Sequence, residues 1–184
     1  MPSETDQTPQ EAQPPAIRIL VVDNDRAHAE AMVESLQRDG YQCTKATSGL
    51  EGKQQIQEGN FDIVITDLVM NEVDGMEVLS TAVDVLPDAQ VVMVTGHASV
   101  PLAVEAMQLG AFNFLEKPIT PKRLRAVTRR AVEAVLLRRD NLELNQRLDE
   151  KFGFEGIIFA SEEMKNVIDQ VRRVAQTDAT VLIA

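Results

Sequence analysis

Acidic, hydroxyl and amine side chains recur in this sequence at the points where short apolar runs end. Six polar residues stand at or directly after the runs ILVV, DIVIT, VVMV and FNFLE: Asp23, Asn24, Asp25, Asp67, Thr95 and Lys117. Carboxylates that share one crevice repel one another and need a counterion. A hard divalent cation, above all Mg²⁺, suits such an all-oxygen site, and a lysine amine can pair with a carboxylate or with a phosphoryl oxygen.

Asp67 is the residue of this set that we expect to act as a nucleophile. A carboxylate nucleophile, a divalent cation, a lysine and a hydroxyl together describe phosphoryl transfer to an aspartate. Asp67 taken alone has a simpler interpretation, because Asp residues at the ends of elements usually form turns or cap helices. The choice depends on whether the rest of the chain brings the other groups to the same place.

Strand and helix patterns alternate along the chain and must position these side chains. Short apolar runs predict strands over residues 16–22, 41–46, 61–66, 89–95 and 112–117. Amphipathic stretches predict helices over residues 26–40, 48–59, 75–86, 99–110 and from near 120. Five such units predict an α/β fold, a doubly wound parallel sheet with helices on both faces. Ligands of such sheets collect at the carboxyl ends of the strands, where the six side chains would meet.

Four segments of the chain carry a family resemblance. In order, VVDND, ITDLVMNEVDG, VVMVTGHAS and FNFLEKP resemble the receiver domain of two-component response regulators, over residues 16–135. The resemblance implies a flavodoxin-like fold with five parallel strands, and a phosphoryl group accepted from a histidine kinase with Mg²⁺ as cofactor. A domain of this kind is a regulatory phosphoacceptor rather than an enzyme.

The resemblance also implies a role for each matching residue of the acidic site. Asp67 matches the phosphoacceptor, and Asp23 and Asn24 match the acidic pair. The metal ligands would then be Asp23, Asn24, Asp67 and the backbone carbonyl of Val69. Asn24 departs from the family pattern, which has an acid there, and an amide oxygen brings no charge. We therefore expect weak Mg²⁺ binding, with Asp25 pointing away from the site.

The remaining matches concern the switch residues. Thr95 matches the switch hydroxyl and Phe114 the switch aromatic. Lys117 before Pro118 matches the lysine of the family, with its cis peptide. Phosphorylation would draw Thr95 and Lys117 toward the new phosphoryl group, and Phe114 would move into the space that Thr95 leaves.

A long helical pattern follows the predicted receiver. It runs from residue 121 to about 151, and its spacing resembles a coiled-coil seam formed by Ala134, Leu137, Asn141, Leu144 and Leu148. We predict a homodimer through residues 121–151, and the alternative is an amphipathic linker that lies on its own domain. The expected division is a disordered tail (1–15), a receiver (16–120), a linker helix (121–152) and a further fragment (153–184).

The last segment, FEGIIFASEEMKNVIDQVRRVAQTDATVLIA, looks like the opening of the AAA+ domain of sigma-54-dependent activators, the NtrC class. The sequence contains no G-x-x-x-x-G-K motif. We therefore expect a chain truncated before the Walker A motif, which does not hydrolyse ATP. Sigma-54 RNA polymerase and DNA would be reached only through domains missing from this chain.

Two other functions compete with the receiver. A haloacid-dehalogenase-like phosphatase would use Asp23 as nucleophile and Asp25 as acid/base, but Arg26 stands where that family has a small or β-branched residue. No acidic pair follows Lys117 to hold its metal either, and Asp67 would have no role. The second is a receiver-like binding module that is silent toward phosphate.

Composition narrows the function classes further. A net charge of −11 argues against nucleic-acid binding by the body of the protein. The single cysteine, Cys43, has no partner for a disulfide or a zinc site, and His28 and His97 are expected to be surface or loop residues. No apolar run approaches the roughly 20 residues of a membrane helix. No export signal is visible, so we expect a cytoplasmic protein without a membrane partner.

Overall fold

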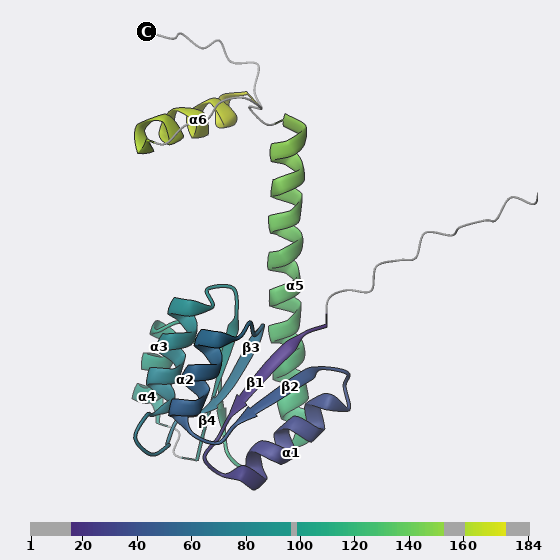
Figure 1. The fold of residues 1–184 in the computed structure, drawn as a ribbon, viewed down its shortest axis with the longest axis vertical. Coiled ribbons are helices and arrows are strands. Elements are labelled where there is room, and N and C mark those ends of the chain that lie inside the picture. The colour runs from purple at the N-terminus through teal and green to yellow at the C-terminus, as the bar shows by residue number, and fades with distance from the viewer. Residues whose placement is uncertain (1–15, 97–98, 153–160, 176–184) are drawn as a thin grey trace, which may run out of the picture. The chain divides into compact units, whose positions relative to one another are not determined.

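The computed structural model describes residues 16–96, 99–152 and 161–175 (Figure 1). Strands and helices alternate along them as predicted. The elements are β1 Arg18–Val22, α1 Arg26–Gln37, β2 Gln42–Ala46, α2 Gly49–Glu58, β3 Ile63–Asp67, α3 Gly75–Val85, β4 Gln90–Thr95, α4 Val100–Gln108, β5 Asn113–Glu116, α5 Pro121–Phe152 and α6 Glu162–Val174.

The five strands form one parallel sheet in the order β2-β1-β3-β4-β5. This confirms the predicted doubly wound α/β fold. The strand order reverses at β1, so the crevice outside the carboxyl ends of β1 and β3 is the place where a ligand is expected. Asp23 follows β1 and Asp67 ends β3, which puts both carboxylates at that crevice.

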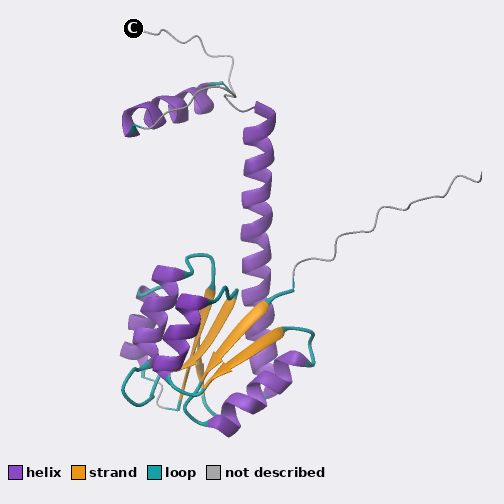
Figure 2. Ribbon diagram, viewed as in Figure 1, coloured by secondary structure: helices purple, strands orange, loops and turns teal. Residues whose placement is uncertain are grey.

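Two apolar cores lie on opposite faces of the sheet. In β1, Ile19 and Val21 belong to the core shared with α1 and α5, whereas Leu20 and Val22 belong to the core shared with α2, α3 and α4. Figure 2 shows α2, α3 and α4 on one side of the strands and α1 and α5 on the other. Each such buried side chain contributes about 1.5–3 kcal/mol of transfer free energy, and the packed strands therefore hold the polar edge in a fixed geometry.

The strand that carries Asp67 differs from the predicted one at both ends. It begins at Ile63 rather than at residue 61, and it ends on Asp67 rather than at residue 66. Asp67 is in register with Val94 of β4, and the N–H of Leu68 donates to the Val94 carbonyl at 2.7 Å. Asp67 therefore does not follow the strand as the pattern suggested, because the ladder with β4 continues through it.

The first half of α5 belongs to the core on one face of the sheet. Four of its apolar side chains are buried there: Leu124, Val127, Ala131 and Val135. The chain divides into two compact units at residues 140 and 141, within α5, so the unit that contains the sheet extends beyond the predicted boundary at residue 120. A domain cut near residue 120 would lose this apolar face.

The second half of α5 and the helix α6 belong to the second compact unit. Leu142 and Leu144 of α5 are exposed, and the side chain of Leu148 lies outside the described residues. Ser161 caps α6 by accepting a hydrogen bond from the N–H of Met164 at 3.3 Å. The expectations for residues 1–15, 153–160 and 176–184 lie outside the described part of the chain. None of the described helices is both long enough and apolar enough to cross a membrane.

Candidate functional site

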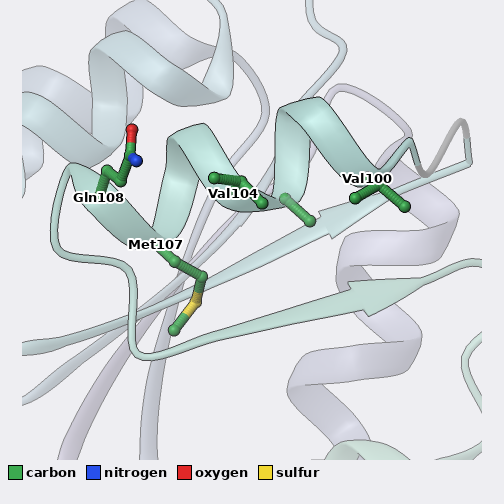
Figure 3. Close-up of a pocket in the computed structure, with 5 residues that line it drawn as sticks. Val100, Val104, Met107 and Gln108 are labelled. Atoms are coloured by element: carbon green, nitrogen blue, oxygen red, sulfur yellow. The ribbon is translucent and has the colours of Figure 1, made fainter.

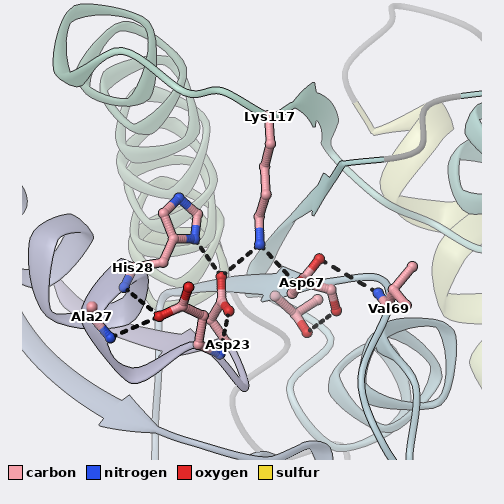
Figure 4. Close-up of polar contacts among 8 residues, drawn as sticks. Asp23, Ala27, His28, Asp67, Val69 and Lys117 are labelled. Carbon is pink, nitrogen blue, oxygen red and sulfur yellow. Dashed lines mark hydrogen bonds and ion pairs between the residues drawn. The ribbon is translucent and has the colours of Figure 1, made fainter.

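The carboxyl edge of the sheet brings three of the predicted residues into direct contact. Figure 4 shows Lys117 between Asp23 and Asp67, although the lysine is 94 and 50 residues away from them in the chain. Its Nζ atom lies 2.7 Å from Asp67 Oδ2 and 3.0 Å from Asp23 Oδ2. One ammonium group is therefore shared by two carboxylates, and the three side chains together keep an excess negative charge.

Asp23 is the more constrained of the two carboxylates. Its side chain is completely buried, and its backbone N–H donates to the Ala46 carbonyl at 3.1 Å. Its Oδ1 atom accepts a hydrogen bond from the Asp25 N–H at 2.9 Å, while Oδ2 contacts Lys117 and the Nδ1 atom of His28 at 2.5 Å. A buried charge is tolerated only when it is paired and hydrogen-bonded, and these three contacts meet that requirement.

Asp67 is held more loosely. Its Oδ2 atom pairs with Lys117, and Oδ1 accepts only a long hydrogen bond of 3.4 Å from the N–H of Val69. The start of α3 packs directly behind it, because a Cβ atom at Gly75 would lie 2.2 Å from the Asp67 carbonyl oxygen. Asp67 is thus fixed through its backbone, whereas its carboxylate has more capacity for a new ligand than that of Asp23.

Lys117 is positioned by the neighbouring strand and held in its charged form. Its N–H donates to the Thr95 carbonyl at 2.8 Å, and the expected cis peptide joins it to Pro118. Burial lowers the pKa of Lys117, but the hydrogen bonds that its ammonium group donates to Asp67 and Asp23 outweigh burial and raise the pKa above that of an ordinary lysine. The site therefore holds a permanent positive charge between its two acids at neutral pH.

The two predicted switch residues come from β4 and β5. Thr95 ends β4 and is fully buried, at the same edge as Asp67 on the adjacent strand. Phe114 is in register with Met93, is half-buried, and packs against the core beneath α2, α3 and α4. A movement of Phe114 would thus change the packing on the face of the sheet that α4 covers.

In the loop after β1, Asn24 and Asp25 are exposed, whereas Asp23 and Asp67 are buried. Asn24 is exposed, directly after the buried Asp23. Asp25 caps α1, and its Oδ1 atom accepts hydrogen bonds from the N–H groups of Ala27 at 2.9 Å and His28 at 3.1 Å. This capping role occupies the carboxylate that a phosphatase mechanism would need as its acid/base.

His28 belongs to this edge, and it lies in a helix rather than in a loop, with a side chain that is only partly exposed. Its side chain is 26% exposed, lies in the first turn of α1, and contacts Asp23 through Nδ1. The available signal was its position: the first turn of a helix that follows a strand end lies at the same edge of the sheet. His97 lies outside the described residues.

The donor atoms at this edge fit Mg²⁺ by their chemistry. The candidates are the carboxylates of Asp23 and Asp67, the side-chain oxygen of Asn24 and the backbone carbonyl of Val69, and all of them are oxygen donors. Within the part of the chain that the structure describes, no three His, Cys, Asp or Glu side chains are grouped so as to hold a metal ion. The set therefore offers two carboxylates, supplemented by neutral oxygens, to a cation.

Known proteins share both the sequence and the fold. Residues 19–129 match the response regulator receiver domain. The transcriptional regulatory protein GlrR of Escherichia coli is 34% identical over 165 residues, which are 90% of this chain and 35% of GlrR. This chain thus spans about a third of the length of such relatives.

Solved structures show the same similarity. The beryllofluoride-activated NtrC4 receiver domain dimer superposes with a TM-score of 0.61 at 32% identity, covering 64% of this chain and 98% of that one. NtrX from Brucella abortus superposes with a TM-score of 0.67 at 28% identity, covering 90% of this chain and 36% of NtrX. The chain belongs to the response regulator receiver domain family.

Proposed function

We propose that this receiver accepts a phosphoryl group on Asp67 from a histidine kinase in a Mg²⁺-dependent reaction. The observation that carries the proposal is the sharing of Lys117 between two buried carboxylates, of which Asp67 has the fewer hydrogen bonds. A carboxylate with spare acceptor capacity beside a fixed ammonium group is suited to attack a phosphorus atom.

The residues of the edge divide the reaction among them. A lone pair of an Asp67 carboxylate oxygen forms the new bond to phosphorus, while the bond from phosphorus to the kinase histidine breaks and its nitrogen keeps the electron pair. Lys117 then pairs with an oxygen of the transferred group. Asp23, Asn24, Asp67 and the Val69 carbonyl would hold Mg²⁺, which supplies positive charge to the phosphoryl oxygens when bound.

The phosphorylated state would be read through Thr95 and Phe114. The new group adds charge and three acceptor oxygens, to which the Thr95 hydroxyl can donate. Movement of Thr95 would open space for Phe114, and a shift in the population of two arrangements would repack β5 and α4. Figure 3 shows the apolar side chains of Val100, Val104 and Met107 on α4, which line a shallow pocket there.

We propose that the signal controls a transcription activator that works with sigma-54. The resemblance of residues 153–184 to the opening of an AAA+ domain and the similarity to transcriptional regulatory proteins support this output. Contacts with sigma-54 RNA polymerase and DNA would belong to domains other than those present here.

We further propose that residues 121–151 mediate a homodimer. Leu137 is 70% exposed and Leu144 is 59% exposed. Asn141 lies between them in the chain, and its side chain accepts a hydrogen bond from Asn145 at 2.9 Å. An exposed apolar seam of this spacing is suited to a second copy of the same helix. A receiver domain dimer is known for NtrC4, which is similar to this chain.

The dimer can be tested without removing the part of α5 that builds the core. Leu137→Lys combined with Leu144→Lys should give monomers in sedimentation experiments, because charges would face each other across the seam. Leu142→Lys is the matched control, since Leu142 is 48% exposed but lies off the seam, and it should stay dimeric. A double variant that remains dimeric would place the interface elsewhere.

The phosphoryl-acceptor function is tested on the intact protein by mass. Incubation with acetyl phosphate and Mg²⁺ should raise the mass by about 80 Da, one phosphoryl group, and chelation of the cation should prevent the increase. A chain that gains no mass under these conditions would be the silent binding module instead.

A further inference from the structure

His28 contacts one carboxylate of the site and not the other. Its Nδ1 atom lies 2.5 Å from Asp23 Oδ2, the same oxygen that Lys117 approaches at 3.0 Å (Figure 4). The structure gives no contact between His28 and Asp67 among the described hydrogen bonds. The backbone of His28 is fixed as well, because its N–H donates to the Asp25 side chain at 3.1 Å.

The direction of this hydrogen bond follows from the chemistry of its two groups. An ionised carboxylate only accepts, so Nδ1 of His28 carries the proton and donates to Asp23. Asp23 thus receives three donors, from Asp25, Lys117 and His28, whereas Asp67 receives one short contact and one long one. The arrangement satisfies Asp23 without any cation.

We propose that His28 is a positioning residue whose hydrogen bond to Asp23 competes with a divalent cation. It thereby lowers the Mg²⁺ affinity of the unphosphorylated site. The inference rests on the proposed function in one respect, since it takes Asp23 as a metal ligand. A cation that binds Asp23 Oδ2 must compete with the His28 hydrogen bond, and hydrogen bonds to charged groups are stronger than neutral ones. His28 therefore opposes metal binding independently of the charge that Asn24 lacks.

A role for His28 as a metal ligand fits the geometry less well. The 2.5 Å separation joins a donor to an acceptor, whereas two ligands of one metal ion are both electron-pair donors and repel at that distance. In the described part of the chain, His28, Asp23 and Asp67 are not grouped as a three-ligand site either. The donor role is the one that the atoms support.

Calorimetric titration with Mg²⁺ tests the proposal on the full chain without a phosphodonor. His28→Leu removes the donor and should tighten binding by about tenfold, the worth of one hydrogen bond to a charged group. His28→Gln can still donate from its amide and should restore affinity to within about twofold of the wild type. Arg26→Leu, which removes an exposed charge paired with Glu30 rather than with Asp23, should change affinity by less than about twofold.

The possible outcomes test the role of His28 separately from the proposed phosphoryl-acceptor function. Equal affinity of His28→Leu and the wild type would overturn the role of His28, and weaker binding would overturn it in favour of a ligand role. His28→Ala replaces the leucine variant if that variant does not fold. The acetyl phosphate experiment on the same proteins reports separately on the proposed function, so a labelled wild type with unchanged variant affinity would overturn only the inference.

Discussion

The strand β3 has a buried aspartate at each end, and the two ends differ in how their charge is balanced. Asp62 precedes the strand, accepts a hydrogen bond from the Arg18 N–H at 2.8 Å and pairs with the guanidinium of Arg139. Asp67 ends the strand and shares the ammonium group of Lys117 with Asp23. The same residue type thus lies in a one-to-one ion pair at one edge and in a two-to-one cluster at the other.

The partner decides what each aspartate can do. Arg139 offers a planar fork of donors that stays charged. Together with the Arg138–Asp88 pair at 2.6 Å, it fastens α5 to the edge of the sheet at the amino ends of the strands, here called the amino edge. Lys117 is a compact point charge shared by two carboxylates, so one negative charge stays unbalanced, and this favours a divalent cation at the carboxyl edge. The amino edge is therefore a structural lock, and the carboxyl edge is a candidate reactive site.

The largest expected difference between the two edges is in labelling. Asp67→Asn should abolish the mass increase with acetyl phosphate and Mg²⁺, because the amide is no nucleophile toward phosphorus. Asp62→Asn should be labelled as the wild type is, since Asp62 lies at the opposite end of the strand. Intact-mass measurement on both proteins decides, and loss of labelling in Asp62→Asn would break the division between the edges.

At the amino edge, the expected effect is on stability rather than on labelling. Asp62→Asn leaves Arg139 without its carboxylate and should lower the free energy of unfolding by about 2 kcal/mol, reduced from a fully buried pair because Arg139 is partly exposed. Asp88→Asn breaks only an exposed pair and should cost less than about 0.5 kcal/mol. Urea unfolding followed by circular dichroism gives both values. Equal losses of stability in the two variants would contradict a structural role for the Asp62–Arg139 pair.

Asn24→Asp should raise the Mg²⁺ affinity of the carboxyl edge, because it adds the negative charge that this site lacks. We expect Mg²⁺ to bind about tenfold more tightly, roughly 1–2 kcal/mol, because charge count is a main determinant of affinity at oxygen sites. The metal-free fold should lose some stability, since a third carboxylate joins the cluster. Equal Mg²⁺ affinities would mean that Asp25 already supplies the charge in spite of its capping role.

The smallest expected effect is a pH dependence confined to the carboxyl edge. The pKa of Lys117 is raised in the folded state, so its stabilising contribution is complete below about pH 10.4, the ordinary pKa of lysine, and is lost as pH rises through the folded value. The difference in unfolding free energy between the wild type and Lys117→Met should shrink above that pH. Tyr41 and Cys43, whose pKa values are also raised, are common to both proteins and cancel. A constant difference would contradict the assigned pairing.

The sequence was sufficient to predict the sheet and the carboxyl edge. Asp23, Asp67 and Lys117 each stand at the end of an apolar run, and parallel strands bring such ends together whatever their separation along the chain. This is a rule of topology, so it needs no knowledge of side-chain directions.

The ion pairs of the amino edge and the contact between His28 and Asp23 could not be predicted in the same way. Asp62 and Arg139 are 77 residues apart, and their pairing depends on how far α5 packs along the sheet before it leaves the core. The contact of the His28 ring with Asp23 depends on the side-chain direction that the first turn of α1 allows. Both features arise from packing, which the pattern of apolar residues does not determine.

The central claim is that Asp67 is the residue that takes the phosphoryl group. Reduction of the labelled protein with borohydride converts a phosphorylated aspartate into homoserine, and peptide mass spectrometry then locates the change. We predict that it is found on Asp67 alone. Its appearance on Asp23 would contradict this account and would favour phosphatase chemistry.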